Sequence, residues 1–95
     1  MDMQTVLVTD GTERAALAVT RSLGQQGVRV VVGAETARSL AGASRYCTRT
    51  WQYPSPLSDS SRFVSSLVDA VDLLGITAIM AVTDSTTQEI GRAHV

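Results

Sequence analysis

Apolar residues along this chain follow two different spacings, and each spacing predicts an element of secondary structure. Four short runs rich in β-branched residues, each closed by glycine, proline or a polar turn, are typical of strands. These runs cover residues 5–9, 28–33, 47–53 and 76–82. The second run contains VRVVVG, and its near-continuous valines indicate burial on both faces, as in a parallel sheet.

Between these runs, apolar positions recur at three- and four-residue steps, which predicts amphipathic helices over residues 13–23 and 62–74. The apolar positions are Ala15, Ala16, Val19 and Leu23 in the first helix, and Phe63, Leu67, Val71 and Leu74, with Val64 and Val68 beside them, in the second. Gly24 and Gly27 should end the first helix and Gly75 the second. Ser60 or Ser61 is the expected N-cap of the second helix. A short, weakly amphipathic helix is predicted over 37–43, and residues 86–95 resemble the first turns of another.

Strands that alternate with helices predict right-handed crossovers and a parallel sheet. We therefore expect an α/β fold: a three-layer α/β/α, Rossmann-like domain with a four-stranded parallel sheet in the order 3-2-1-4. A chain of 95 residues corresponds to one domain, residues 1–95. In this order the switch point lies between strands one and four. The turns after these strands should therefore meet at the carboxyl edge, where ligands bind in open parallel sheets.

The residues of these two turns are the candidate substrate-binding residues. They are Asp10, Gly11, Thr12, Glu13 and Arg14 after the first strand, and Thr83, Asp84 and Ser85 after the fourth. Arg14 could pair with a carboxylate or phosphate. A structural interpretation remains open beside the binding one, because Asp10 or Thr12 could cap the first helix and Glu13 could complement its positive end.

A dinucleotide site is a weaker hypothesis for the first turn. Such a site needs several glycines through which backbone amides approach a pyrophosphate. The sequence DGTER supplies one glycine and two carboxylates, which repel phosphate. Glu35 does lie where a ribose-binding acid would follow the second strand. Its alternative role is that of a first-turn acid stabilised by the dipole of the helix predicted at 37–43.

Composition excludes several classes of function. The chain is 44% hydrophobic and 18% charged, with a net charge of −1, so no global field favours nucleic acid or a membrane surface. All eight basic residues are arginine, which excludes a P-loop and Schiff-base chemistry. The residues offer no catalytic triad and no metal-ligand spacing, and the lone Cys47 is expected to be a half-buried strand residue. Trp51 and Tyr53 should share one face of the third strand, in the core or an interface. No apolar run has the length of a membrane span, so we expect a cytoplasmic protein.

Several stretches together resemble a known family. In order, they are VLVTDGTERAALAVTRSLGQQGVRVVV, SLAGASRY, YPSP and IMAVTDS. Their order and spacing are similar to those of the N-terminal, pre-ATP-grasp domain of ATP-grasp proteins. The subgroup that fits best is the carbamoyl-phosphate-synthase-like carboxylate–amine ligases, and the similarity runs from Thr5 to about Ile90.

This resemblance implies a function for a larger protein. The family activates a carboxylate as an acylphosphate, which an amine or another nucleophile then attacks. ATP and Mg²⁺ are held by a later domain with lysines and acidic residues, so we expect no cofactor and no catalytic residue in this chain. The first domain shapes the acceptor-substrate side of the cleft, for a small-molecule carboxylate or amine. We therefore expect an N-terminal fragment of a longer ligase, inactive alone.

Two other functions are compatible with the sequence. The chain could be a stand-alone module that binds a nucleotide or small metabolite in the same crevice, or a degenerate dehydrogenase-type domain that responds to NAD(P). A sheet that normally packs against further domains exposes a strand edge or an apolar surface when isolated. Self-association into a homo-oligomer is therefore expected, and light scattering would detect it.

Overall fold

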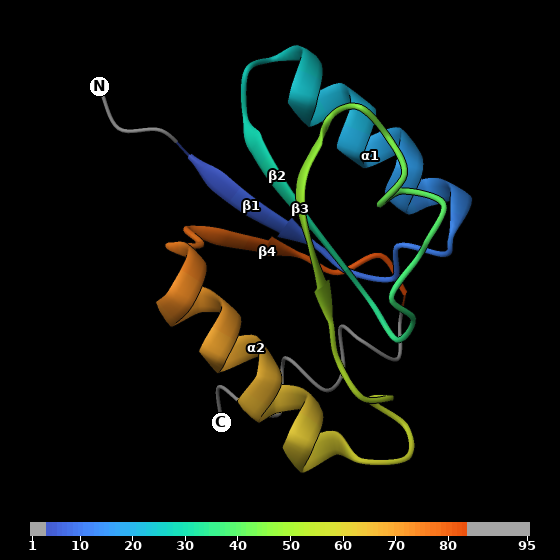
Figure 1. Ribbon diagram of the computed structural model, residues 1–95, viewed down its shortest axis with the longest axis vertical. Coiled ribbons are helices and arrows are strands. Elements are labelled where there is room, and N and C mark those ends of the chain that lie inside the picture. Colours follow the sequence, from blue (N-terminus) through green and yellow to red (C-terminus); the bar gives the residue numbers. More distant parts are fainter. Residues whose placement is uncertain (1–3, 84–95) are drawn as a thin grey trace.

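The computed structural model describes residues 4–83 (Figure 1). In chain order the elements are β1 (Thr5–Val8), α1 (Arg14–Gln25), β2 (Arg29–Ala34), β3 (Cys47–Gln52), α2 (Ser60–Leu74) and β4 (Ala78–Met80). The four strands pair in parallel as one sheet, in the order β3-β2-β1-β4. The predicted α/β class, Rossmann-like strand order and parallel pairing are confirmed, although β4 is shorter than the predicted 76–82.

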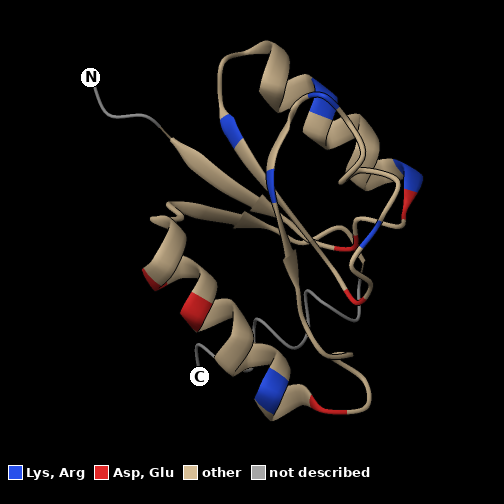
Figure 2. Cartoon of the chain, viewed as in Figure 1, with Lys and Arg blue, Asp and Glu red and all other residues tan. Residues whose placement is uncertain are grey.

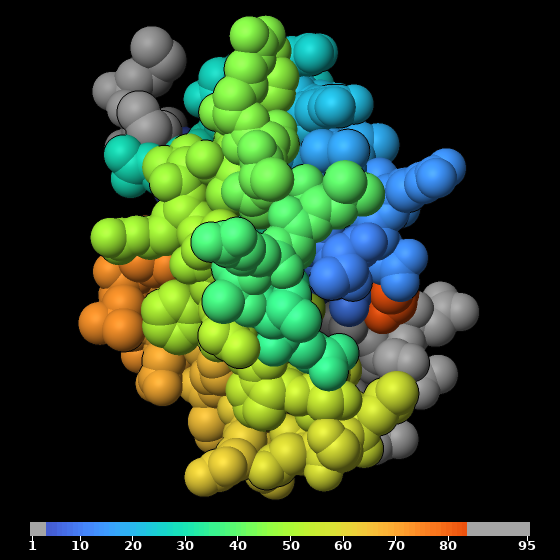
Figure 3. Space-filling view, turned by 45° about the vertical axis from the view of Figure 1, so that its right-hand side comes forward, coloured from blue at the N-terminus to red at the C-terminus, as the bar shows by residue number. Residues whose placement is uncertain are grey.

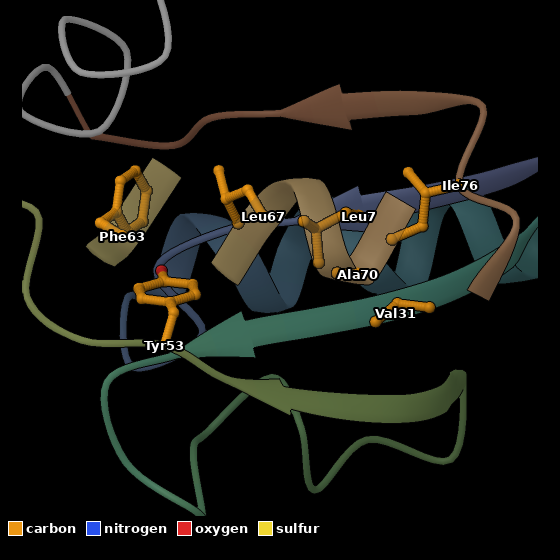
Figure 4. Packing of buried hydrophobic residues seen from close by; sticks show 7 residues of the cluster. All are labelled: Leu7, Val31, Tyr53, Phe63, Leu67, Ala70 and Ile76. Carbon is orange, nitrogen blue, oxygen red and sulfur yellow. The ribbon is translucent and has the colours of Figure 1, made fainter. Parts of the chain in front are cut away.

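The sheet lies between the two helices, with α1 on one face and α2 on the other (Figure 1). Side chains alternate across β1 because successive residues of a strand point to opposite faces. Leu7 therefore packs toward α2, whereas Val6 and Val8 pack toward α1. The α2-side cluster consists of Leu7, Val31, Tyr53, Phe63, Leu67, Ala70 and Ile76 (Figure 4). The three-layer arrangement is thus built from two separate apolar layers, one on each side of the valine-rich central strands.

The ends of the helices differ from the prediction in two places. Asp59, rather than Ser60 or Ser61, caps α2, and its Oδ1 accepts a hydrogen bond from the Arg62 N–H at 3.2 Å. Gly75 ends α2 as expected, in a left-handed conformation with φ of 65°. Gly24, however, lies inside α1, where a Cβ would come within 2.5 Å of the Tyr46 side chain. Gly24 is therefore explained by close packing and not by the end of the helix.

The helix predicted over residues 37–43 is wrong, because the segment forms a series of turns. Its backbone groups bond to a neighbouring loop and to local side chains. The Ala41 N–H donates to the Gly11 carbonyl at 2.8 Å, and the Gly42 N–H donates to Ser39 Oγ at 3.1 Å. The Ala43 N–H does form an i-to-i−4 bond, with the Ser39 carbonyl at 3.1 Å, but the Ala41 amide bonds to Gly11 and not within the segment, so this turn does not continue as a helix.

The helical faces follow the predicted periodicity with local corrections. Val68 is 53% exposed and Ala15 is also exposed, so neither belongs to the core. Ala70 and Thr20 are fully buried in their place. In each helix the buried face is therefore turned slightly from the predicted face. The spacing of apolar residues alone does not resolve so small a difference.

Thr20 supplies a test of core packing. Its side chain is fully buried on α1, and its Oγ1 has no hydrogen-bond partner within residues 4–83. Burying an unpaired hydroxyl costs free energy that an isosteric methyl group does not. Thr20→Val is expected to raise the free energy of unfolding by about 1 kcal/mol, as measured by urea denaturation. The matched control Thr20→Ser keeps the hydroxyl, loses the methyl group and should lower it. A destabilised valine variant would show that the hydroxyl is hydrogen-bonded in solution.

Both β3 and β4 are edge strands of the described sheet. Within residues 4–83 each pairs on one side only, which agrees with the self-association expected from the sequence but does not test it. None of the helices within residues 4–83 has the length and apolar character needed to cross a bilayer.

Candidate functional site

The turn after β1 and the segment after β4 meet at the carboxyl edge of the sheet. Asp10 Oδ2 accepts hydrogen bonds from Thr9 Oγ1 at 2.7 Å and from the Thr83 N–H at 3.1 Å. Thr9 Oγ1 in turn accepts from the Val82 N–H at 3.2 Å. In Figure 3 the last described residues lie beside the segment that follows β1. The predicted meeting of the two turns is therefore confirmed.

Tyr53 supports the turn after β1 through a hydrogen bond to its backbone. It follows β3, is 3% exposed, and packs edge-on against Phe63 with ring centroids 4.9 Å apart (Figure 4). Its Oη accepts a hydrogen bond from the Asp10 N–H at 2.8 Å and donates to the Gly33 carbonyl at 3.4 Å. Asp10 has a φ of 59°, a left-handed conformation that aspartate tolerates better than most residues. The Tyr53 bond and the Oδ2 bonds together fix Asp10 in that conformation.

Burial is the main cause of the raised pKa of Tyr53, and the carboxylates of Asp10 and Glu35 raise it further. The hydrogen bond from the Asp10 backbone acts in the opposite direction but does not offset the burial. Tyr53 therefore stays protonated and keeps its hydrogen-bonding role at neutral pH.

A pocket of about 210 Å³ opens above this hydrogen-bonded turn. It is lined by Asp10, Thr12, Glu13, Ala34, Glu35, Tyr53, Pro56, Leu57 and Thr83. Three acidic residues from two different loops line it, and none of the lining residues within 4–83 is an arginine or a histidine. The apolar part of the wall comes from Pro56 and Leu57, in the loop after β3. The pocket thus combines a negative potential with an apolar side, as suits a small cationic ligand.

Four of the eight predicted site residues line this pocket: Asp10, Thr12, Glu13 and Thr83. Gly11 is buried beneath it, and a Cβ there would lie 2.6 Å from Ser39 Oγ and from Val32 Cγ1. Gly11 is therefore needed for close packing. Arg14 is exposed at the start of α1, outside the pocket lining. Asp84 and Ser85 lie outside the described residues.

The capping interpretations of Asp10 and Thr12 are wrong. The N-cap of α1 is Glu13, whose side chain forms no capping hydrogen bond. The carboxylate of Asp10 is engaged with Thr9 and Thr83 instead. The dipole interpretation of Glu35 is wrong as well, because no helix follows it. Both acids have in common that they face the pocket.

Among the wall residues that were not predicted for the site, three come from the segment after β3: Tyr53, Pro56 and Leu57. The sequence carries a signal for them: the YPSP turn follows the third strand, and parallel strands place all their carboxyl ends at one edge. The prediction considered only the two strands beside the switch point.

The fold and pocket define an open, parallel α/β domain of Rossmann-like strand order, with a pocket lined by acidic residues at its carboxyl edge. Neither a protein-family model nor a curated protein sequence matches the chain. Across residues 4–83, no three His, Cys, Asp or Glu side chains are grouped so that they could hold a metal ion. The pocket is therefore interpreted from its own chemistry.

The two tyrosines provide a pH test of this geometry. A hydrogen bond from Arg45 lowers the pKa of Tyr46 below its ordinary 10.0, whereas the pKa of Tyr53 is raised. Phenolate absorbance should therefore show Tyr46 ionising first. Because Tyr53 has a higher pKa folded than unfolded, its contribution to stability is fully present below about pH 10 and is lost as the pH rises beyond it. Tyr53→Phe should flatten that alkaline loss. Simultaneous ionisation of both tyrosines in the folded protein would contradict the burial of Tyr53.

Proposed function

We propose that this chain is the N-terminal, substrate-side domain of an ATP-dependent carboxylate–amine ligase of the ATP-grasp, carbamoyl-phosphate-synthase-like type, and that its acidic pocket receives the amine acceptor. The observation that carries the proposal is the pocket at the carboxyl edge, lined by Asp10, Glu13 and Glu35. The resemblance of the sequence to the pre-ATP-grasp domain supplies the reaction class.

Charge decides between the two substrates of such a ligase. A protonated amine gains Coulomb energy from the three carboxylates, whereas a carboxylate or an acylphosphate loses it. The domain accordingly receives the acceptor amine. The activated carboxylate belongs to the part of the ligase that binds ATP, where the nucleotide supplies the phosphoryl group for activation.

The hydrogen bonds beneath the pocket favour a preformed site. Asp10 is held from three directions, by Tyr53 Oη, Thr9 Oγ1 and the Thr83 backbone. A wall fixed before binding costs less ordering entropy when the ligand arrives. Glu13 and Glu35 are exposed, so they can approach the ammonium group without loss of structural contacts. In this proposal Asp10 positions the loop, and the two glutamates contact the amine.

The test is a binding titration followed by amide NMR shifts. The probes are the free amino acids and their N-acetyl derivatives, which differ in the ammonium charge. At least one free amino acid is expected to shift the amide resonances of Thr12, Glu13 and Glu35 saturably, and its N-acetyl form is not. Glu13→Gln and Glu35→Gln should each weaken binding by about threefold, the size expected for solvent-exposed charge pairs.

Asp69→Asn is the matched control, because Asp69 is an exposed acid on α2 outside the pocket lining. Equal binding of the N-acetyl derivatives, or equal weakening by Asp69→Asn, would contradict an amine site. The proposal also expects no micromolar binding of ATP by this chain, which calorimetry can measure. A cytoplasmic location belongs to the proposal, because the parent ligase needs ATP and free amines.

A further inference from the structure

Charge is strongly segregated along the chain and across the fold. Residues 14–58 contain six of the eight arginines but one acid, Glu35. Figure 2 shows these arginines spread over α1, β2, β3 and the loops that join them. The acidic residues that lie within a helix, Asp69 and Asp72, are both on α2. The single ion pair within residues 4–83 joins Arg62 to Asp59, away from this face. The α1–β3 side is therefore rich in arginines that are not neutralised by carboxylates.

Two of these arginines flank a second pocket, at the end of the sheet opposite the acidic one. It has a volume of about 580 Å³ and is lined by Arg21, Gln25, Ala43, Ser44, Arg45 and Tyr46. None of the lining residues in the described part of the chain is an aspartate or a glutamate. Arg21 and Gln25 are one turn apart on α1, and the other four residues form the turn before β3. Figure 3 shows this segment packed against α1.

Tyr46 organises the pocket. Its ring lies over Gly24 of α1, where no Cβ could fit, and the Arg45 guanidinium carbon lies 5.0 Å from the ring centroid. Arg45 Nη2 also donates to Tyr46 Oη at 3.0 Å. These contacts hold Arg45 against the ring while Arg21 approaches from the helix. Two guanidinium groups, the Gln25 amide and the Ser44 hydroxyl line the pocket and can donate hydrogen bonds to a ligand.

We propose that this pocket, defined by Arg21, Arg45 and Tyr46, is a binding site for a phosphate group. Guanidinium groups form bidentate hydrogen bonds with phosphate oxygens, and two of them balance a dianion. The carboxyl end of α1 opposes an anion in its immediate vicinity, so the affinity comes from the arginines. The phosphate belongs either to free inorganic phosphate or to a phosphorylated small molecule. The site is independent of the proposed amine pocket.

The experiment follows amide NMR shifts of the 95-residue chain during titration with inorganic phosphate and, separately, with glycerol 3-phosphate, at constant ionic strength. Saturable shifts are expected at Ser44, Arg45 and Tyr46. Arg21→Gln and Arg45→Gln should each weaken binding by about tenfold, the effect of losing one charge-assisted hydrogen bond. The matched control Arg62→Gln removes an arginine from α2 and should leave the affinity unchanged.

The outcomes are distinct because both arginines are exposed, so their loss should leave the fold and its amide spectrum intact. Tighter binding of glycerol 3-phosphate than of phosphate would support the site and assign it to an organic phosphate, and the reverse would assign it to the free ion. Unchanged affinity in the Arg21→Gln/Arg45→Gln double variant would overturn the proposal. So would equal weakening by Arg62→Gln, or shifts that fail to saturate.

Discussion

Replacing Phe63 by alanine is expected to lower the free energy of unfolding by about 3–5 kcal/mol. Phe63 is fully buried in the α2-side cluster, and its ring meets Tyr53 edge-on at 4.9 Å. The substitution removes the aromatic contact and leaves a cavity between α2 and the sheet (Figure 4). Urea denaturation monitored by circular dichroism measures the loss, and such a value is large compared with the total stability of a small domain.

Val68→Ala is the matched control for Phe63→Ala. Val68 lies on the same helix but is 53% exposed, so its truncation should change stability by less than about 0.5 kcal/mol. Phe63→Leu should fall between the two, since it keeps most of the apolar volume. A loss below about 1 kcal/mol for Phe63→Ala would show that the helix does not pack on the sheet as described.

The second large effect is expected at Asp10. Asp10→Ala removes the oxygen that accepts from Thr9 Oγ1 and the Thr83 N–H, and it places alanine at a φ of 59°. The lost hydrogen bonds and the left-handed strain together should cost about 2–4 kcal/mol. Denaturation by urea measures the cost, and the amide shifts of Thr83 should report the loosened segment after β4.

Asp10→Asn is the matched control for Asp10→Ala. Asparagine keeps an acceptor oxygen and tolerates the left-handed region, so it should cost about half as much or less. Asp10→Gly relieves the strain but restores no acceptor, and it should fall between the two. If all three variants were as stable as the unsubstituted protein, the hydrogen bonds of the Asp10 carboxylate would not contribute to the stability of the fold.

Much of the fold was predictable because the apolar pattern is repeated at two periods. The valines of β2 and the four-residue steps of α2 indicate a buried central strand and a one-sided helix, and alternation fixes their parallel connection. The failed predictions concern places where tertiary contacts replace local ones. Within residues 37–43 the Ala41 N–H donates to the Gly11 carbonyl of another loop, and Gly24 accommodates the ring of Tyr46.

The candidate site was predictable to the extent that topology determines it. The order 3-2-1-4 places the turns at Asp10 and Thr83 together, and they do meet. The contribution of Tyr53 depends on a phenol that reaches under the neighbouring strand to the Asp10 amide, a contact between residues 43 positions apart. The spacing of residues along the sequence does not predict this long-range hydrogen bond. The role of Glu35 was misassigned for a related reason, since it depended on a helix that does not form.

The hydrogen bond between Asp10 and Thr83 has a consequence for the order of events during synthesis. It joins residues separated by 73 positions, and β4 is synthesised after the other three strands of the described sheet although it pairs with the first. Contacts this distant in sequence close late, because the intervening chain must already be collapsed. The acidic pocket therefore cannot exist on a nascent chain that has not yet delivered β4. If the pocket binds an amine as proposed, such binding would stabilise domains that have completed their fold over chains still being synthesised.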